Sequence, residues 1–173
     1  NYKLKSTFYY RDTKSSYDSS ATKEESVTSD NKIYAIQTGI ERKTENLFDN
    51  FMLHYHNYDR KYYVQGKKDK YYSESLVAKV EREVLLDNKL SFGFGSEYKY
   101  DWGHYITKTF TSQTKGHLSN LGIFINAGYK LSKNQVLSFH GRNDDHKETG
   151  GNKTYKINFT QFLGPFKLGV THT

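Results

Sequence analysis

Residues 120–145 read NLGIFINAGYKLSKNQVLSFHGRNDD, and this stretch decides the fold class. Every second residue from the second position onward is apolar or aromatic: Leu121, Ile123, Ile125, Ala127, Tyr129 and Leu131. The residues between them are mostly small, polar or charged: Gly122, Phe124, Asn126, Gly128 and Lys130. Alternation with a period of two is typical of a β-strand that has one apolar face. What covers that face is the first question that the sequence raises.

The composition offers no large core to cover it. The chain has 173 residues, a hydrophobic fraction of 35% and a mean hydropathy of −0.89. It is not disordered either, because 16 Tyr, 11 Phe and one Trp are too many aromatic residues for a solvated, charge-rich tail. Low hydropathy with many aromatic residues fits a sheet that alternates polar and apolar side chains.

Charge, cysteine content and motifs exclude several classes. A net charge of +7 would suit an anionic partner, but the basic residues are spread along the chain, which disfavours nucleic acid. The absence of cysteine excludes disulfides and thiolate metal sites. No catalytic constellation or nucleophile elbow is found, so we do not expect an enzyme. No apolar run approaches the ~18–20 residues of a membrane helix, so any contact with a bilayer is expected through strands.

The alternation predicts nine strands. They lie at about 2–11, 32–43, 50–59, 71–85, 89–101, 118–131, 135–144, 152–163 and 166–173. Four connections are short, at 43–49, 86–89, 132–135 and 163–165, and four are long and polar, at 12–30, 59–70, 102–118 and 144–152. Short and long connections alternate without a break.

An antiparallel up-and-down meander with tight turns at one end and long loops at the other is the plan of a transmembrane outer-membrane β-barrel. About ten residues, each rising ~3.3 Å and tilted near 40°, reach the ~25 Å height of the apolar band of such barrels. The predicted fold class is therefore all-β, with the apolar face toward lipid and the polar face toward a lumen. This arrangement needs no large internal core.

Arg82 is an exception on the apolar side of the strand predicted at 71–85. An arginine there would cost ~2–4 kcal/mol at the bilayer midplane but only ~0–1 kcal/mol near the interface. Because the 86–89 turn follows closely, the sequence predicts an interfacial position for Arg82, or else a β-bulge that turns its side chain away.

Residues 142–155, RNDDHKETGGNKTY, resemble the R-x-D-D-x-x-x-x-G-G-x-x-T-y pattern in the barrel of TonB-dependent outer-membrane receptors. The resemblance is greatest to the cobalamin transporter group. The matching positions are Arg142, Asp144, Asp145, Gly150, Gly151, Thr154 and Tyr155. The flanking stretches GIFINAGYKLSKNQVLSF and INFTQFLGPFKLGVTHT look like strands of the same region, and the earlier hairpins fit more loosely.

The resemblance implies a barrel of about 22 strands in the bacterial outer membrane, plugged by an N-terminal domain that contacts the inner-membrane TonB complex. Residues 1–173 are then expected to be an internal part of the barrel, without the plug and the remaining strands. The implied cargo is a scarce, bulky nutrient, with cobalamin preferred and an iron–siderophore complex second. Long loops with tyrosine-rich bases would capture it, and outer-membrane lipid and lipopolysaccharide would surround the wall.

Three groups of residues have the donor types of a metal site. Calcium in external loops would use Asp144, Asp145 and His146, or acidic residues of the first long loop: Asp12, Asp18, Glu24, Glu25 and Asp30. His54 and His56 share a strand face, but no third ligand has suitable spacing. We interpret all three groups as strand ends or lumen-facing polar residues, and we expect no resident cofactor.

Two alternatives remain at the level of sequence. The first is a small self-contained outer-membrane barrel of eight to ten strands, either an adhesin or a porin-like protein. It predicts that the reading frame does not extend past both ends of this chain. The second is a soluble β-sheet binding module, which predicts that residues 1–173 are soluble without detergent.

Overall fold

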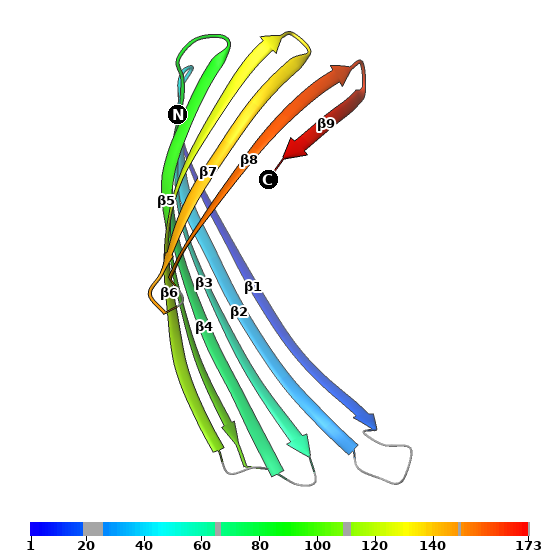
Figure 1. Ribbon diagram of the computed structural model, residues 1–173. Coiled ribbons are helices and arrows are strands. Elements are labelled where there is room, and N and C mark those ends of the chain that lie inside the picture. Colours follow the sequence, from blue (N-terminus) through cyan, green and yellow to red (C-terminus); the bar gives the residue numbers. More distant parts are fainter. Residues whose placement is uncertain (19–25, 65–66, 109–111, 149, 173) are drawn as a thin grey trace.

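The computed structural model describes residues 1–173 apart from 19–25, 65–66, 109–111, 149 and 173. The described residues form nine strands: β1 (Tyr2–Asp18), β2 (Ser26–Lys43), β3 (Leu47–Val64), β4 (Lys67–Leu85), β5 (Leu90–Thr107), β6 (Ser112–Ser132), β7 (Gln135–His146), β8 (Gly150–Leu163) and β9 (Phe166–His172). They form one curved antiparallel sheet in chain order (Figure 1). The predicted all-β meander is confirmed. The described residues contain no helix that is long and apolar enough to cross a membrane.

The strands are longer than the alternation predicts. Strands β1–β6 have 17 to 21 residues each and continue through most of the stretches predicted as long loops at 12–30, 59–70 and 102–118. The loop predicted at 144–152 is also too long, because β7 reaches His146 and β8 begins at Gly150. These boundaries were wrong because the backbone ladder continues where neither face is apolar, as in the pairing of Asp59 with Tyr72.

The tight turns at the other end of the sheet are confirmed. In the turn after β4, Asp87 Oδ1 accepts hydrogen bonds from the backbone N–H groups of Lys89 at 2.6 Å and Leu90 at 2.7 Å. These two hydrogen bonds hold the pKa of Asp87 below its usual range. In the last turn Gly164 has a φ of 59°, which only glycine adopts without strain, and Pro165 follows it. We call this end of the sheet the turn end and the opposite end the loop end.

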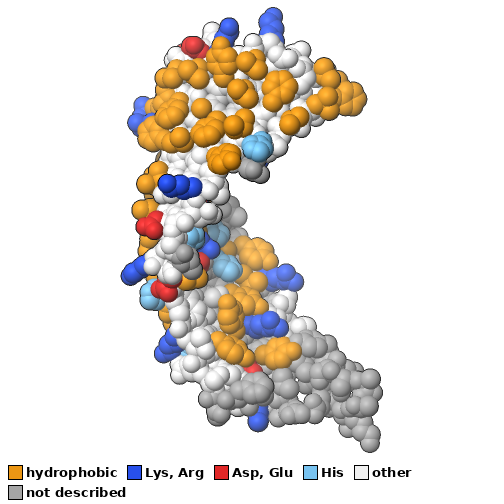
Figure 2. Space-filling view, in the orientation of Figure 1, with side chains coloured by type: hydrophobic (Ala, Val, Ile, Leu, Met, Phe, Trp, Pro, Cys, Tyr) orange, Lys and Arg blue, Asp and Glu red, His pale blue; other side chains and the backbone are white. Residues whose placement is uncertain are grey.

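The cross-strand register separates an apolar face from a polar face. Leu121 of β6 pairs with Tyr98 of β5, which pairs with Ala78 of β4, so the apolar positions of successive strands form one band. Ile123 is 56% exposed and Val80 is 47% exposed, so no second layer of the described chain covers this band. Figure 2 shows hydrophobic side chains gathered over the turn-end part of the sheet, where β7–β9 lie.

Arg82 lies on the apolar face close to the turn end, as the sequence predicts. Its register partner is Asp49 of β3, and the β3–β4 register is continuous through this pair. The alternative of a β-bulge at Arg82 is therefore wrong. The carboxylate of Asp49 receives the guanidinium directly, and this partner explains how a charge is tolerated at the border of the band.

On the polar face, side chains of one strand pack closely over glycines of the neighbouring strand. Phe124 is the one buried hydrophobic residue among those described, at 4% exposure. Its ring lies over Gly95, where an added Cβ would be 2.5 Å from the ring Cζ. The ring also stacks on His140 at 6.3 Å between centroids, and the Lys79 ammonium lies 5.1 Å from the ring centroid. Side chains of the polar face therefore pack closely against one another, whereas those of the apolar band remain exposed.

Candidate ligand-binding site on the polar face

A cavity of about 380 Å³ lies on the polar face near the loop end of β3, β4 and β5. Its lining is mostly tyrosine: Tyr58, Arg60, Tyr62, Asp69, Tyr71 and Tyr105. The register brings them together, because Arg60 pairs with Tyr71 and Tyr71 pairs with Tyr105 on the same face. We call this site the tyrosine–arginine pocket. Its size is that of a small-molecule site, which usually occupies a few hundred Å³.

The side chains of the tyrosine–arginine pocket hold one another in place. The rings of Tyr58 and Tyr71 meet edge to face at 5.8 Å, and the Tyr58 hydroxyl donates to Asn31 Oδ1 at 3.2 Å. The Arg60 guanidinium lies over the Tyr62 ring at 5.1 Å from its centroid. These contacts orient the aromatic faces and the cation before any ligand arrives.

Arg60 is the residue of the tyrosine–arginine pocket with spare hydrogen-bonding capacity. Its Nε is buried and has no hydrogen-bond partner among the described residues. A buried N–H without an acceptor is costly, on the order of 1–3 kcal/mol. An anionic or carbonyl-bearing ligand would supply the missing acceptor and recover this energy.

A larger and more polar hollow of about 680 Å³ adjoins the pocket, and Tyr71 and Tyr105 line both. Its other side chains include His56 and the ion pair of Lys99 with Asp101, at 2.8 Å. The two tyrosines therefore lie between an aromatic pocket and a polar hollow. A ligand larger than the pocket alone has room to extend into this hollow.

The motif predicted from the family resemblance does not converge on one ligand site. The cross-strand register places Arg142, Asp144 and Thr154 on the polar face. It places Asp145 and Tyr155 on the apolar face. Gly150 begins β8 with a φ of 84°, and Gly151 pairs with Asp145. In this structure the motif marks the start of β8 and one ion network.

That ion network centres on Arg142. Its Nε donates to Asp144 Oδ2 at 2.8 Å, and its Nη2 donates to Glu97 Oε1 at 2.9 Å. Asn120 Nδ2 also donates to Asp144, at 2.9 Å. Gly122 lies beneath, and an added Cβ there would be 2.5 Å from Arg142 Nη2. Both carboxylates are held by the Arg142 guanidinium, so this cluster joins β5, β6 and β7.

Of the groups considered for metal binding, only the described members can be placed. Within the described ranges no three His, Asp or Glu side chains are placed to hold a metal ion. Asp144 is engaged by Arg142, and Asp12 pairs with Lys32 at 3.7 Å. Glu24 and Glu25 lie outside the described residues.

The sequence did not single out Arg60 or its cavity. Residues 59–70 were predicted as a loop, and a loop has no faces, so the alternation of Tyr58, Arg60 and Tyr62 carried no meaning there. Tyr105 comes from another predicted loop. The usable signal was the tyrosine-rich character of these segments, which predicted a ligand-capturing region without its members.

The site and the sheet together define a class of protein. A curved meander with an uncovered apolar band on one face and a fitted polar face on the other is a section of an outer-membrane β-barrel wall. The tyrosine–arginine pocket lies on the polar side, which is the lumen side of such a wall.

Comparison with known proteins gives the same class. No family model matches the sequence, and no curated protein does. Among solved structures, the siderophore receptor PirA from Acinetobacter baumannii matches with a TM-score of 0.61 and 14% identity, over 98% of this chain and 33% of that chain. PirA from Pseudomonas aeruginosa matches with a TM-score of 0.55 and 15% identity, over 95% and 33%. The RagAB peptide importer matches with a TM-score of 0.59 and 13% identity, over 79% and 20%.

At these identities the matches show the fold. The chain spans about one third of the length of the two PirA receptors. The predicted outer-membrane β-barrel fold is confirmed, and with it the outer-membrane location that this fold implies. The narrower likeness to cobalamin transporters is not shown by these structures.

Proposed function

We propose that this chain forms part of the wall of a TonB-dependent receptor and that its tyrosine–arginine pocket contacts an iron–siderophore complex. The observation that carries the proposal is the buried, unpartnered Nε of Arg60 among four tyrosines. The fold shared with two siderophore receptors supports the same class of cargo. The chain spans about a third of those receptors, so uptake by a whole receptor is part of the proposal.

The chemistry of the pocket suits such a ligand. Ferric siderophores present catecholate, hydroxamate or carboxylate oxygens around the metal, and several carry aromatic rings. A guanidinium donates to these oxygens with charge assistance, and tyrosine rings stack on planar groups while their hydroxyls donate. The metal stays inside its chelator as cargo, so the wall needs no metal ligands of its own.

The wall itself has a passive role in the proposed transport. It holds the ligand on the lumen side near the loop end, where a nutrient would arrive from outside the cell. Release would depend on a plug domain and the inner-membrane TonB complex, which supply the energy. In this proposal the pocket determines which ligand is retained, and the plug domain determines when it moves.

The test uses the full-length receptor that contains these residues. Arg60→Gln is compared with the unaltered protein for binding of a panel of ferric siderophores, by quenching of protein fluorescence. We expect the affinity for at least one catecholate or carboxylate complex to fall about tenfold, which corresponds to ~1.4 kcal/mol. Arg11→Gln is the matched control, because Arg11 is exposed on the polar face of β1 and does not line the pocket.

Two results would contradict the proposal. One is unchanged binding in Arg60→Gln while the control behaves like the unaltered protein. The other is the absence of binding for every siderophore tested, together with normal folding.

Cobalamin is a second candidate, favoured by the RNDDHKETGGNKTY motif at 142–155. Cobalamin is bulkier than the tyrosine–arginine pocket and would extend into the adjoining polar hollow. The same assay with cyanocobalamin distinguishes the two cargoes. Binding of cyanocobalamin without binding of any siderophore would favour the second candidate.

A further inference from the structure

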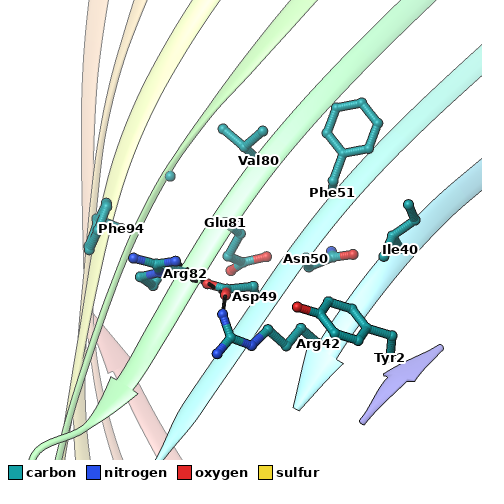
Figure 3. Close-up of a pocket in the computed structure, with 11 residues that line it drawn as sticks. Tyr2, Ile40, Arg42, Asp49, Asn50, Phe51, Val80, Glu81, Arg82 and Phe94 are labelled. Atoms are coloured by element: carbon teal, nitrogen blue, oxygen red, sulfur yellow. Dashed lines mark hydrogen bonds and ion pairs between the residues drawn. The ribbon is translucent and has the colours of Figure 1, made fainter. Parts of the chain in front are cut away.

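A second hollow lies on the opposite, apolar face, near the turn end of β2, β3 and β4 (Figure 3). Its volume is about 540 Å³. On the apolar face it combines three charged side chains with an apolar wall, which is unusual for a surface that faces hydrocarbon. These charged residues are Arg42, Asp49 and Arg82, one from each of three neighbouring strands, and a fourth, Glu81, lines the hollow from the polar face.

One carboxylate serves two guanidinium groups in this hollow. Arg82 Nε donates to Asp49 Oδ1 at 2.6 Å, and Arg82 Nη2 donates to Asp49 Oδ2 at 3.2 Å. Arg42 Nη1 lies farther away, at 3.8 Å from the same Oδ2. The side chains of Arg42 and Arg82 are 41% and 48% exposed, so both remain accessible to a ligand.

The hollow therefore carries one uncompensated positive charge. The hollow is lined by one other carboxylate, that of Glu81. Glu81 lies on the polar face of β4 and pairs there with Lys79 Nζ at 2.9 Å. The Tyr2 ring lies 6.0 Å from the Arg42 guanidinium carbon and does not neutralise it. An anion seated between the two guanidinium groups would complete the charge balance.

The rest of the hollow is apolar and extends away from the turn end. Ile40, Phe51, Val80 and Phe94 line it, and all four are exposed on the apolar face. Ile40, Phe51 and Val80 lie one register row farther into the band than the charged row. The charges thus lie at the border of the band, and the apolar wall leads from them toward its middle.

This order of groups matches one phospholipid of the leaflet at the turn end. We infer that the hollow binds such a lipid, with its phosphate against Arg42 and Arg82 and an acyl chain along Phe51, Val80 and Phe94. Arginine forks donate paired hydrogen bonds to phosphate oxygens, and this pairing is strong where water is scarce. The site lies on the lipid side of the wall, so it does not depend on the identity of the transported nutrient.

The test counts bound lipids on the full-length protein. The purified receptor is delipidated in mild detergent, incubated with palmitoyl-oleoyl phosphatidylglycerol and examined by native mass spectrometry. We expect one tightly retained lipid on the unaltered protein and at least a fivefold lower retention on Arg42→Gln. This substitution leaves the Arg82–Asp49 pair in place, and the heat-dependent gel mobility of a folded barrel verifies assembly. Lys70→Gln is the control, because it removes one exposed cation from the same face at the loop end and should leave retention unchanged.

Two further arms use the unaltered protein and need no variant. The first replaces the phospholipid with palmitoyl-oleoyl glycerol, which has the same chains and no phosphate, and we expect it to be lost. The second adds inorganic phosphate in excess, and we expect it not to displace the phospholipid. Equal retention on Arg42→Gln, equal retention of the phosphate-free lipid, or displacement by free phosphate would each overturn the inference.

Discussion

The two faces of the sheet use the same strands but are stabilised in different ways. On the apolar face, side chains such as Val80 and Ile123 contact no second layer of the described chain, and in a bilayer hydrocarbon would fill the space between them. On the polar face, Phe124 and Arg142 each lie over a glycine of the neighbouring strand, and Arg142 also donates a hydrogen bond to Glu97. Lipid chains adapt to an apolar side chain of any shape, whereas two closely packed side chains do not adapt to a change in the shape of either. The apolar face should therefore be sensitive to polarity and the polar face to shape.

The largest expected effect comes from a charge placed in the apolar band. Leu76→Arg should cost ~2–4 kcal/mol, because Leu76 lies three same-face register rows from Arg82 and the guanidinium would be in hydrocarbon. The free energy of unfolding of the full-length protein in lipid vesicles, measured by denaturant titration, tests this expectation.

Val77→Arg is the matched control, since Val77 lies on the same strand but on the polar face. There we expect a smaller cost, because the guanidinium would remain on the polar face and would not enter hydrocarbon. Similar costs at the two sites would contradict the assignment of the faces.

An intermediate effect is expected from a methyl group on the polar face. Gly122→Ala would place a Cβ 2.5 Å from Arg142 Nη2 and 2.7 Å from Asp144 Oδ1. The ion network must then shift, and we expect a loss of ~1–2 kcal/mol in the free energy of unfolding. Gly116→Ala in the same strand is the control, because a Cβ there has open space within 4 Å.

A double-mutant cycle with Arg142→Ala sharpens this test. If the methyl group acts through the ion network, Gly122→Ala should cost little once Arg142 has been removed. Fully additive costs would show that Gly122 matters for another reason.

The smallest effect belongs to the turn end, outside both faces. Asp87→Ala removes the acceptor of two backbone N–H groups and should lower stability slightly at neutral pH. Because folding lowers the pKa of Asp87, its contribution is present above the ordinary aspartate pKa and is lost as the pH falls through the lower folded value.

Unfolding of the unaltered protein and of Asp87→Ala at neutral and at acidic pH measures this contribution. The difference between them should shrink on acidification. Asn88→Ala in the same turn serves as the control, and a difference that grows at low pH would contradict the role assigned to Asp87.

The alternation in the sequence predicted the fold better than it predicted the element lengths. Leu121 to Leu131 and the stretch around Phe92 and Phe94 identified the apolar face, and the turns at 86–89 and 132–135 were placed correctly. The extensions of β1–β6 were missed because their sequences do not alternate between apolar and polar residues. There the ladder is continued by hydrogen bonding to a neighbour that is itself a strand, and this information is not local.

The candidate sites show the same division. The sequence indicated that tyrosine-rich segments would contact a ligand and that Arg82 would lie near an interface. It could not indicate that the Nε of Arg60 would be buried among tyrosines from three strands, because that depends on the register between β3, β4 and β5. It also could not indicate that Arg42 and Arg82 would share Asp49.

By itself, then, the sequence determined which side chains could face hydrocarbon and where the chain had to turn, since both follow from the order of residues along one strand. The tertiary structure alone decided how far each strand continues and which residues of different strands meet. Hydrogen bonds between strands set the register, and a change of one residue in that register would bring together a different set of side chains.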